Sequence, residues 1–376
     1  MLFVLLDLHL QPDPSQERVL ALLRALAQTE PFIPLLICRK HSPLADRAAA
    51  EKLPVLALGS SWPLHPVSLL RIWRRLHRHR QVIVHSFDEQ AAVLAHLLAA
   101  QRKSDRTIVM HTRFFTPGKH LPMLQKSYAA AGAFVCGSSA VAKLVQQENG
   151  LSPDIFRIIP PGTQQSDYPE RVEQRNGRIA ICMPGALTEG QGQESLVQAM
   201  AALWQMEDLP PWEVRLVGSG PMFHFLLEEA QKLGVLPRLA ILGDQDLRAV
   251  LPQCKLLVLP PGELVYAPAL AGGWAVGLPV ICPALPAALD LVREGENALL
   301  VAPHNPQDLA AAILRIIRDA TLAEKLVHGG KKTLVSVSEE RMIADYVILC
   351  HELIARQGWA TEESPPAVCN GNAEQQ

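Results

Sequence analysis

The chain has 376 residues, of which 49% are hydrophobic and 19% are charged, and its formal net charge is −2. This balance predicts a folded protein of two ordinary-sized domains and excludes disorder of the whole chain. A net charge near zero gives no general attraction to nucleic acid, and we expect no nucleic-acid partner. The seven cysteines are scattered without a C-x-x-C pair, which predicts reduced thiols and neither a disulfide framework nor a zinc site.

Strand-like and helix-like segments alternate through the first part of the chain. The opening apolar run, 2–6, lacks a basic start and is broken by Asp7, so it predicts a first strand and not a signal peptide. Helix-like stretches separate four further apolar runs, at 33–37, 82–84, 108–110 and 133–136. Repeated alternation of this kind predicts a parallel, Rossmann-like α/β domain.

The segment Val67–Arg80 is basic and has the spacing of a helix. Leu69, Ile72, Trp73 and Leu76 recur at helical intervals, and the arginines fall largely on other faces. Two interpretations are open: the apolar stripe packs on the sheet, or the helix lies on an anionic membrane surface. No segment is long and apolar enough to predict a transmembrane helix. We therefore expect a cytoplasmic protein, peripheral at the inner face of the membrane under the second interpretation.

A domain boundary is predicted within residues 160–177, which are polar, rich in proline and glycine, and without periodicity. Strand-like and helix-like segments alternate again after it. We expect an N-terminal Rossmann-like domain over 1–165, a C-terminal Rossmann-like domain over 178–335, and a disordered polar tail over 358–376.

Residues 255–282 place two apolar strands around a helix rich in alanine and glycine. The first strand runs into Pro260-Pro261-Gly262 and Glu263, and Gly277-Leu278-Pro279-Val280 leads into the second. In parallel sheets, ligands bind beyond the carboxyl ends of the strands, where a helix N-terminus can meet an anion. Glu263 lies at such an end. Gly218-Ser219-Gly220-Pro221 lies between another strand and helix, where backbone can approach a ligand closely.

These motifs, in this order, resemble the nucleotide-sugar segment of GT-B glycosyltransferases of the family-4 kind. Further matches to that family are Ser138-Ser139-Ala140-Val141, Pro160-Pro161-Gly162-Thr163 and Leu242-Gly243. The resemblance implies two Rossmann-like domains facing each other across a cleft, with the segment 336–357 as a helix that crosses back to the first domain. It also implies a retaining transfer of sugar from a nucleotide-sugar donor to a glycan or lipid-linked acceptor of a cell-surface polysaccharide or lipopolysaccharide pathway.

The resemblance also assigns roles to residues. Glu263 would orient the sugar, and His111, at the end of a strand-like run, would lie near the transferred sugar. Donor contacts would come from Gly185, Gln191, Gly218, Gly220, Leu242, Ala267 and Gly272. No metal or other cofactor is expected, because the helix N-termini near Met222 and Ala267 can face the phosphates.

Three positions depart from the family pattern. Ala186 and Gln191 stand where the family has an arginine and a lysine for the diphosphate, and Gly272 stands where it has a glutamate for the ribose. Asp13-Pro14 also replaces a Gly-Gly pair after the first strand. A charged hydrogen bond contributes roughly 1.5–3 kcal/mol, so these losses favour a second hypothesis, a catalytically inactive homologue that acts as a binding or scaffolding subunit. A third hypothesis, a sugar-nucleotide epimerase, rests on the fold alone.

Overall fold

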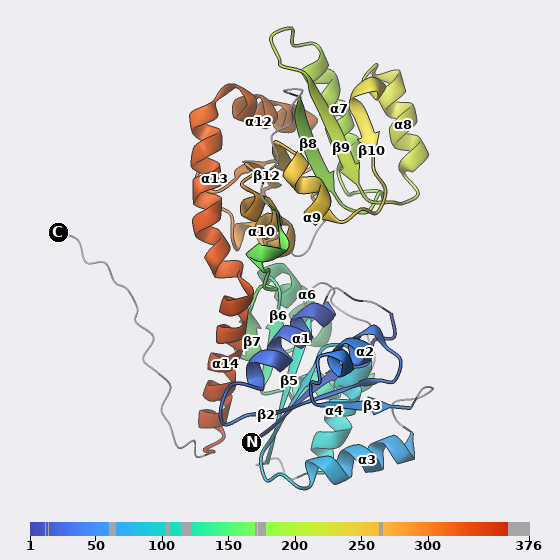
Figure 1. Ribbon diagram of the computed structural model, residues 1–376, viewed down its shortest axis with the longest axis vertical. Coiled ribbons are helices and arrows are strands. Elements are labelled where there is room, and N and C mark those ends of the chain that lie inside the picture. The colour runs from blue at the N-terminus through green and yellow to red at the C-terminus, as the bar shows by residue number, and fades with distance from the viewer. Residues whose placement is uncertain are drawn as a thin grey trace, which may run out of the picture.

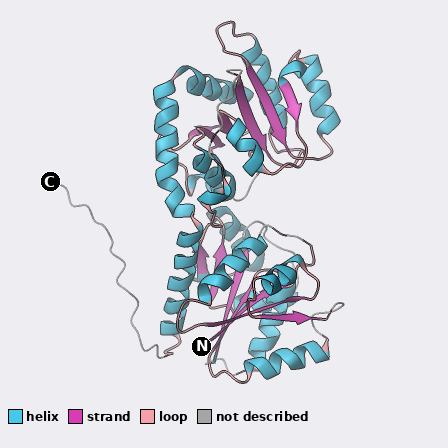
Figure 2. Ribbon diagram, in the orientation of Figure 1, coloured by secondary structure: helices cyan, strands magenta, loops and turns pink. Residues whose placement is uncertain are grey.

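The computed structural model describes residues 1–11, 13, 15–59, 65–102, 106–113, 122–169, 171, 178–262 and 266–359. These residues form two α/β domains that meet at a narrow waist (Figure 1). Each domain has one sheet in which every strand pair is parallel, with helices on both faces (Figure 2). The predicted α/β fold with two Rossmann-like domains is confirmed.

The first domain is built on a seven-stranded sheet in the order β3-β2-β1-β4-β5-β6-β7. Its central strands β1 and β4 are buried along their whole length, as expected where helices cover both faces of a parallel sheet. The strands are β1 (Leu2–Asp7), β2 (Ile33–Arg39), β3 (Val55–Leu58), β4 (Val82–Ser86), β5 (Thr107–Arg113), β6 (Ala133–Cys136) and β7 (Phe156–Ile158). The helices between them are α1 (Ser15–Leu26), α2 (Pro43–Ala50), α3 (Pro66–Leu76), α4 (Glu89–Ala100), α5 (Pro122–Ala129) and α6 (Ser139–Asn149).

The second domain is built on a six-stranded sheet in the order β10-β9-β8-β11-β12-β13. Its strands are β8 (Ile179–Pro184), β9 (Trp212–Val217), β10 (Leu239–Ile241), β11 (Leu256–Val258), β12 (Val280–Pro283) and β13 (Leu299–Val301). Its helices are α7 (Gln193–Trp204), α8 (Phe223–Lys232), α9 (Leu247–Val250), α10 (Ala267–Val276), α11 (Pro286–Leu289), α12 (Pro306–Arg318) and α13 (Ala320–Leu334). Along the chain, the strands of the first sheet therefore precede the segment 160–177, and those of the second sheet follow it.

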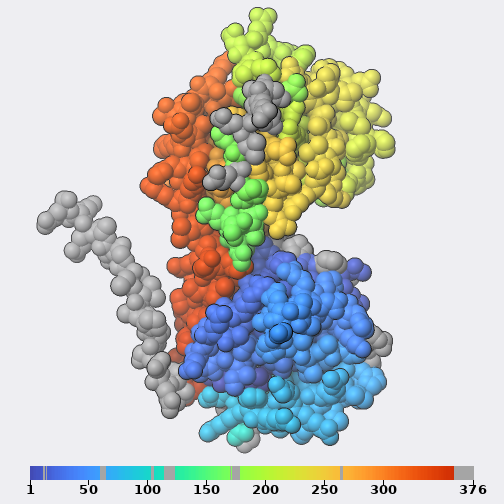
Figure 3. Space-filling model, viewed as in Figure 1, coloured from blue at the N-terminus to red at the C-terminus, as the bar shows by residue number. Residues whose placement is uncertain are grey.

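The last helix, α14 (Glu339–Arg356), leaves the second domain and packs on the first. It buries Met342, Tyr346 and Leu349 in the apolar core that contains strand residues of β1 and β5. The Tyr346 hydroxyl lies 2.9 Å from Thr112 Oγ1 of β5. The orange and red helices at the C-terminal end of the chain thus run along one side of both domains (Figure 3). The tail predicted at 358–376 lies, from residue 360 onward, outside the described residues.

Some sequence-based boundaries differ from the structure. The pattern gave five strands in the first domain and missed β3 and β7, which form the two edges of the sheet. Both are short and half-exposed, so neither has the continuous apolar run of a buried strand. The helix expected within Val67–Arg80 ends at Leu76. The six cysteines in the described part of the chain are free and buried, in agreement with reduced thiols.

Candidate functional site

The carboxyl edges of the two sheets face each other across the waist. Helices α1 and α6 begin at the carboxyl edge of the first sheet, and α9 and α11 follow carboxyl ends of the second. The charge of Arg248 in α9 acts on Glu17 in α1, and Asp290, directly after α11, accepts a 2.7 Å hydrogen bond from the backbone N–H of Ser139 in α6. A ligand held between the domains would therefore meet the strand ends of both.

Glycines interlock the loops on the second-domain side. Gly218 donates its N–H to the Gly243 carbonyl at 2.8 Å, and Leu187 donates to the Ser219 carbonyl at 2.9 Å. A Cβ atom at Gly218 would lie 2.0 Å from the Gly185 carbonyl oxygen, and one at Gly220 would lie 2.4 Å from that of Leu187. Only glycine permits this approach, and both residues have positive φ. The structure thus brings four of the predicted donor residues together, Gly185, Gly218, Gly220 and Leu242, the last through its N–H bond to the Leu216 carbonyl.

Gln191 lies against the loop that follows β11. A Cβ atom at Gly262 would come within 2.2–2.5 Å of the Gln191 side-chain amide, so the two residues are in close contact. The amide oxygen of Gln191 is buried without a hydrogen-bond partner among the described residues. Glu263 is the next residue after Gly262, but it lies outside the described residues, and its role stays a prediction.

Two helices of the second domain, α8 and α10, begin without a side-chain cap. The N-cap residues of α8 and α10, Met222 and Tyr266, make no capping hydrogen bond through their side chains. Helix N-termini carry partial positive charge and attract anions. Ala267, a predicted donor contact, is the first residue of α10 and is buried.

Gly272 lies in the middle of α10 and is covered by a tyrosine from the interdomain segment. A Cβ atom at Gly272 would lie 2.8 Å from the Tyr168 hydroxyl oxygen. Burial raises the pKa of Tyr168 above its usual value. The space beside Gly272, where the family has a carboxylate for the ribose, is therefore occupied by the Tyr168 ring.

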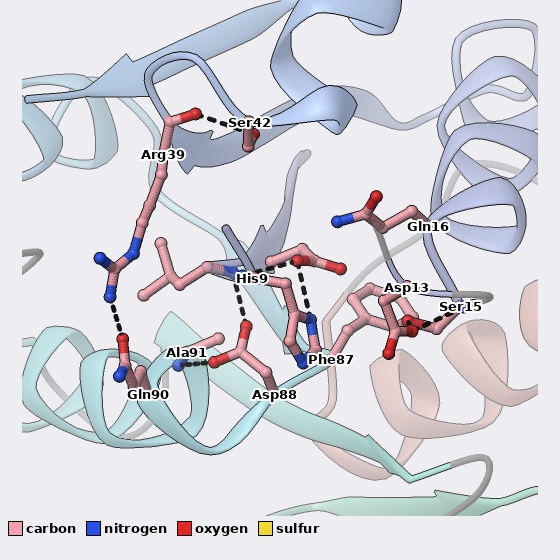
Figure 4. A network of polar contacts seen from close by, with 12 residues as sticks. His9, Asp13, Ser15, Gln16, Arg39, Ser42, Phe87, Asp88, Gln90 and Ala91 are labelled. Atoms are coloured by element: carbon pink, nitrogen blue, oxygen red, sulfur yellow. Dashed lines mark hydrogen bonds and ion pairs between the residues drawn. The ribbon is translucent and has the colours of Figure 1, made fainter. Parts of the chain in front are cut away.

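The first-domain side carries a polar network at the ends of β1 and β4 (Figure 4). His9 Nδ1 lies 3.1 Å from Asp7 Oδ1, and the Asp88 carboxylate accepts hydrogen bonds from the N–H groups of Leu8 at 2.5 Å and Ala91 at 2.8 Å. Asp88 thereby caps α4 and ties it to the end of β1. Asp7 is fully buried, and its second oxygen has no partner among the described residues.

The network holds His9 as a cation. The hydrogen bond to Asp7 raises the pKa of His9 to about 9, and the charges of Asp7, Asp88 and Asp13 act in the same direction. Asp7, His9 and Asp88 also present ligand atoms within 4.8 Å of one another, a spacing that could hold a metal ion. A metal-ligating histidine must be neutral, however, and the Asp7 pairing favours the protonated ring. In the absence of a metal, the arrangement therefore provides a fixed positive charge at this edge of the sheet.

Two arginines border a pocket of about 310 Å³ beside this network. Arg39, at the end of β2, donates to the side chain of Gln90, and Arg113, at the end of β5, donates to the Phe87 carbonyl at 3.2 Å and to the Tyr128 hydroxyl at 2.7 Å. His9 lines the same pocket. Three cationic groups thus line this pocket together with the acidic Asp88 and Glu89, a mixed lining that can hydrogen-bond a hydroxyl-rich ligand such as a sugar.

His111 lies inside the first domain. It is 1% exposed, its Nδ1 lies 2.6 Å from Ser86 Oγ, and its Nε2 lies 3.2 Å from the Ser127 carbonyl oxygen. Burial lowers the pKa of His111 to about 3, as it does for the neighbouring His85, so both rings are neutral. The catalytic role of His111 stays a prediction, and in this conformation the ring supports the packing of the first domain.

In the turn between β1 and α1, the Asp13 carboxylate binds the first residue of α1. Asp13 accepts hydrogen bonds from the N–H and the hydroxyl of Ser15. This amide is therefore already occupied, which agrees with the departure from a phosphate-binding Gly-Gly turn seen in the sequence.

Sequence reasoning missed His9, Asp88, Arg39 and Arg113 as site residues. Each stands at or directly after the carboxyl end of a strand, β1, β4, β2 and β5 respectively. That position was the available signal, because ligands of parallel sheets gather there. These four residues were not selected from the sequence, because none of them belongs to a motif of the family.

Two family models match consecutive parts of the chain. The model described as Glycosyltransferase Family 4 matches residues 16–166, and that described as Glycosyl transferases group 1 matches residues 164–333. Among curated proteins, an uncharacterized glycosyltransferase of Methanocaldococcus jannaschii is 23% identical over 187 residues, which cover 49% of this chain and 47% of the relative. The lipopolysaccharide core biosynthesis glycosyltransferase LpsE of Rhizobium meliloti is 29% identical over 162 residues, which cover 43% of this chain and 46% of the relative.

The similarity to the first curated relatives spans about half or less of their length. Solved structures match more fully: Anabaena HepE in complex with UDP has a TM-score of 0.74 at 15% identity, covering 94% of this chain and 100% of that one. A glycosyltransferase of Rickettsia africae has a TM-score of 0.74 at 15% identity, covering 94% and 98%. At this identity the likeness establishes the fold. Among the described residues, every helix is too short or too polar to cross a bilayer.

Proposed function

Because the chain belongs to the GT-B glycosyltransferases of group 1 and family 4, we propose that it transfers a sugar from a nucleotide-sugar donor to a glycan or lipid-linked acceptor. The names of several relatives refer to lipopolysaccharide or exopolysaccharide, which supports a cell-surface polysaccharide pathway for this protein. The family resemblance supports a retaining reaction. The proposal also places the protein at the inner face of the membrane, where a lipid-linked acceptor would be found.

The observation that carries the proposal is the cluster of second-domain loops around Gly185, Gly218 and Gly243, called the second-domain wall. Its backbone is held in place by the interlocked loops at Gly185, Gly218 and Gly243, and the N-terminus of α10 opens beside them. The N–H groups of Gly185, Leu187 and Gly218 are used within this interlock. Other amides of the same loops, held in place by it, would stabilise the negative charge that develops on a nucleoside diphosphate as the sugar leaves, without reorganisation during the reaction. HepE was solved with UDP and with UDP-glucose, and its fold is similar to this one.

The proposal does not require a metal ion. Ala186 and Gln191 supply no charge, so the charge balance would come from helix N-termini and from cations on the first domain. Protonated His9 and the arginines Arg39 and Arg113 lie at the carboxyl edge that faces the second domain. These three groups would substitute for the two missing cations from the facing edge of the first sheet.

The first experiment is calorimetric titration of the purified protein with UDP, GDP and UDP-sugars in the absence of metal. We expect micromolar binding of one nucleotide, followed by sugar transfer or slow donor hydrolysis with the matching sugar nucleotide. The variant Gly218→Ala should abolish this binding, because its Cβ would collide with the Gly185 carbonyl oxygen. Gly59→Ala is the control, since no atom of the described residues lies within 4 Å of the added Cβ.

A non-catalytic binding subunit is the second candidate function. The specific observation in its favour is Tyr168, which fills the space beside Gly272 where the family has its ribose carboxylate. Under this hypothesis the protein would show no sugar transfer and no donor hydrolysis, whether or not it binds a nucleotide in the calorimeter. Nucleotide binding without any turnover would support the binding subunit over the transferase.

A further inference from the structure

Helix α3 carries one apolar row on the sheet and a second apolar row in solvent. Ser68, Ile72 and Leu76, spaced four residues apart, are buried. Val67, Leu70 and Trp73 are 58%, 47% and 40% exposed. Residues three apart lie on one helix face, so these three side chains form a continuous outer row. The first interpretation, an apolar stripe packed on the sheet, holds for Ile72 and Leu76, whereas Trp73, which the sequence placed in the same stripe, lies on the exposed face.

Arginines flank the outer row without acidic partners. Arg71, Arg74 and Arg75 on α3 and Arg78 and Arg80 after it are exposed, and no ion pair between described residues includes any of them. The sequence has no aspartate or glutamate from residue 53 to residue 87. A sixth cation lies beside the end of α3.

That cation is Arg102, which closes the end of α3. Its guanidinium donates to the carbonyl oxygens of Leu76 at 3.0 Å and His79 at 2.9 Å. Desolvation and the nearby charges of the N-terminus, Arg75, Arg102 and Arg78 lower the pKa of His79. The local field is therefore positive, although the chain as a whole carries a formal charge of only −2.

The arginines also line a groove. Arg71, Arg74 and Arg75 face Leu35, Pro54, Val55 and Leu56, at the amino ends of β2 and β3, across a space of about 370 Å³. This space is large enough for a phosphate group and the glycerol that carries it. Guanidinium groups bind phosphate oxygens through paired hydrogen bonds. The cationic groove and the exposed apolar row lie on the same helix. An anionic lipid presents a charged headgroup next to its acyl chains, so the groove could bind the headgroup while the apolar row contacts the chains.

We propose that α3 docks the first domain on a bilayer that contains anionic phospholipid. Arg71, Arg74 and Arg75 bind lipid phosphates in the groove, and Val67, Leu70 and Trp73 enter the headgroup region. A tryptophan at this depth and arginines above it match the known preferences of these side chains at bilayer surfaces. Figure 1 places α3 at the end of the first domain that lies farthest from the second domain, so docking leaves the waist between the domains uncovered.

The test is flotation of the full chain with vesicles of phosphatidylcholine alone or mixed with phosphatidylglycerol, at low and high salt. We expect binding only to the mixed vesicles and release by salt. The variant R71Q/R74Q/R75Q should bind on the order of 100-fold more weakly, since each arginine near an anionic surface contributes about fivefold. L70S/W73S should bind about tenfold more weakly, because less apolar surface enters the bilayer.

Matched variants separate docking from general charge or folding effects. R315Q/R318Q/R356Q removes three exposed arginines from α12 and α14 and should bind vesicles as the wild type does. R71K/R74K/R75K should keep most of the binding. The arginine variants should melt at the wild-type temperature, because the altered arginines are exposed and form no ion pair among the described residues. L70S/W73S loses the ring contact between Trp73 and His77, so its melting temperature is measured alongside its binding. The proposal fails if wild-type protein does not float, if it floats equally with neutral vesicles, or if the α12/α14 control loses as much binding.

Docking and sugar transfer are independent in this design. R71Q/R74Q/R75Q should keep its affinity for nucleotide, because α3 is remote from the loops at Gly185 and Gly218. Loss of vesicle binding with nucleotide binding intact assigns the effect to α3 alone. An acidic protein as the true partner would show as charge-dependent binding to that protein with no flotation, which also overturns the proposal.

Discussion

At the scale of single residues, Gly272 and Tyr168 decide what the second-domain wall can bind. The ring lies where a side chain at position 272 would begin, so a larger residue there must displace it. Restoring a ribose carboxylate therefore needs two changes and not one. Gly272→Glu should improve nucleotide affinity only when Tyr168→Ala vacates the space.

The simpler form of this prediction concerns stability. Gly272→Ala should lower the free energy of unfolding by about 1 kcal/mol, the lower end of the cost of overpacking, because the Tyr168 ring can swing aside at its outer edge. In the Tyr168→Ala background the same substitution should cost nothing. Urea denaturation of the four proteins gives the coupling energy. Equal costs in both backgrounds would show that the ring does not cover Gly272 in solution.

Among the histidines, three with large pKa shifts dominate the dependence of stability on pH, and the smaller lowering of the pKa of His79 acts in the same direction as that of His85 and His111. The pKa of His85 and of His111 is lowered to about 3 by burial, below the unfolded value of about 6.5. The unfolded chain therefore binds more protons, and stability falls as pH drops below 6.5. The pKa of His9 is raised to about 9 by Asp7, so its contribution is complete below 6.5 and is lost as pH rises toward 9.

We expect maximal stability near pH 6.5, measured as the urea midpoint from pH 5 to 9. His9→Gln should flatten the alkaline side and leave the acid side unchanged. His328→Gln, at an exposed histidine of α13, is the control and should alter neither side. A midpoint that is constant from pH 5 to 6.5 would contradict the buried, neutral state of His85 and His111.

At the scale of elements, the sequence predicted what local chemistry determines. The helix expected within 336–357 is observed as α14, Glu339–Arg356, with Ser338 as its cap. The edge strands β3 and β7 were missed because their pairing depends on neighbours distant in sequence. The sequence could single out the glycines at 218 and 220 as donor-contact candidates because their motif is local, whereas His9, Asp88 and Arg113 meet only through the order of strands in the sheet. Tyr168 lay in a segment that looked like a linker, and only the fold places its ring on α10.

The start of α14 offers an element-scale prediction. Gly162 passes so close to this helix that a Cβ atom there would lie 2.6 Å from the Glu339 Cα and 3.0 Å from the Glu339 nitrogen. Both are backbone atoms, which cannot turn aside as a side chain can. Gly162→Ala should therefore destabilise the protein by roughly 2 kcal/mol and loosen α14, observed as faster amide exchange around Tyr346. Gly59→Ala is the matched control, and equal melting of the two variants would contradict the close approach.

At the scale of the whole molecule, both domains share one apolar cluster. It joins Val141 and Phe134 of the first domain to Leu270 and Trp274 of the second. This shared core, together with α14, holds the carboxyl edges of the two sheets toward each other. Sugar transfer would need those edges to approach and separate in each cycle, so a contact that breaks during this motion should be polar and small.

Asp290 makes such a contact. Its carboxylate accepts a 2.7 Å hydrogen bond from the Ser139 N–H at the start of α6. A negative charge from the second domain thus pairs with an amide that has no partner within the helix, and it also faces the partial positive charge of the N-terminus of α6. Asp290→Asn should weaken the contact by about 1 kcal/mol and open the waist, seen as a larger radius of gyration in solution scattering and faster amide exchange at Ser139. Asp208→Asn, at an exposed loop position, should change neither quantity. If nucleotide binding draws the domains together, a saturating nucleotide should restore the wild-type radius of gyration in the Asp290 variant. An unchanged radius of gyration in the variant without nucleotide would contradict the prediction, because the apolar cluster alone would then fix the domains.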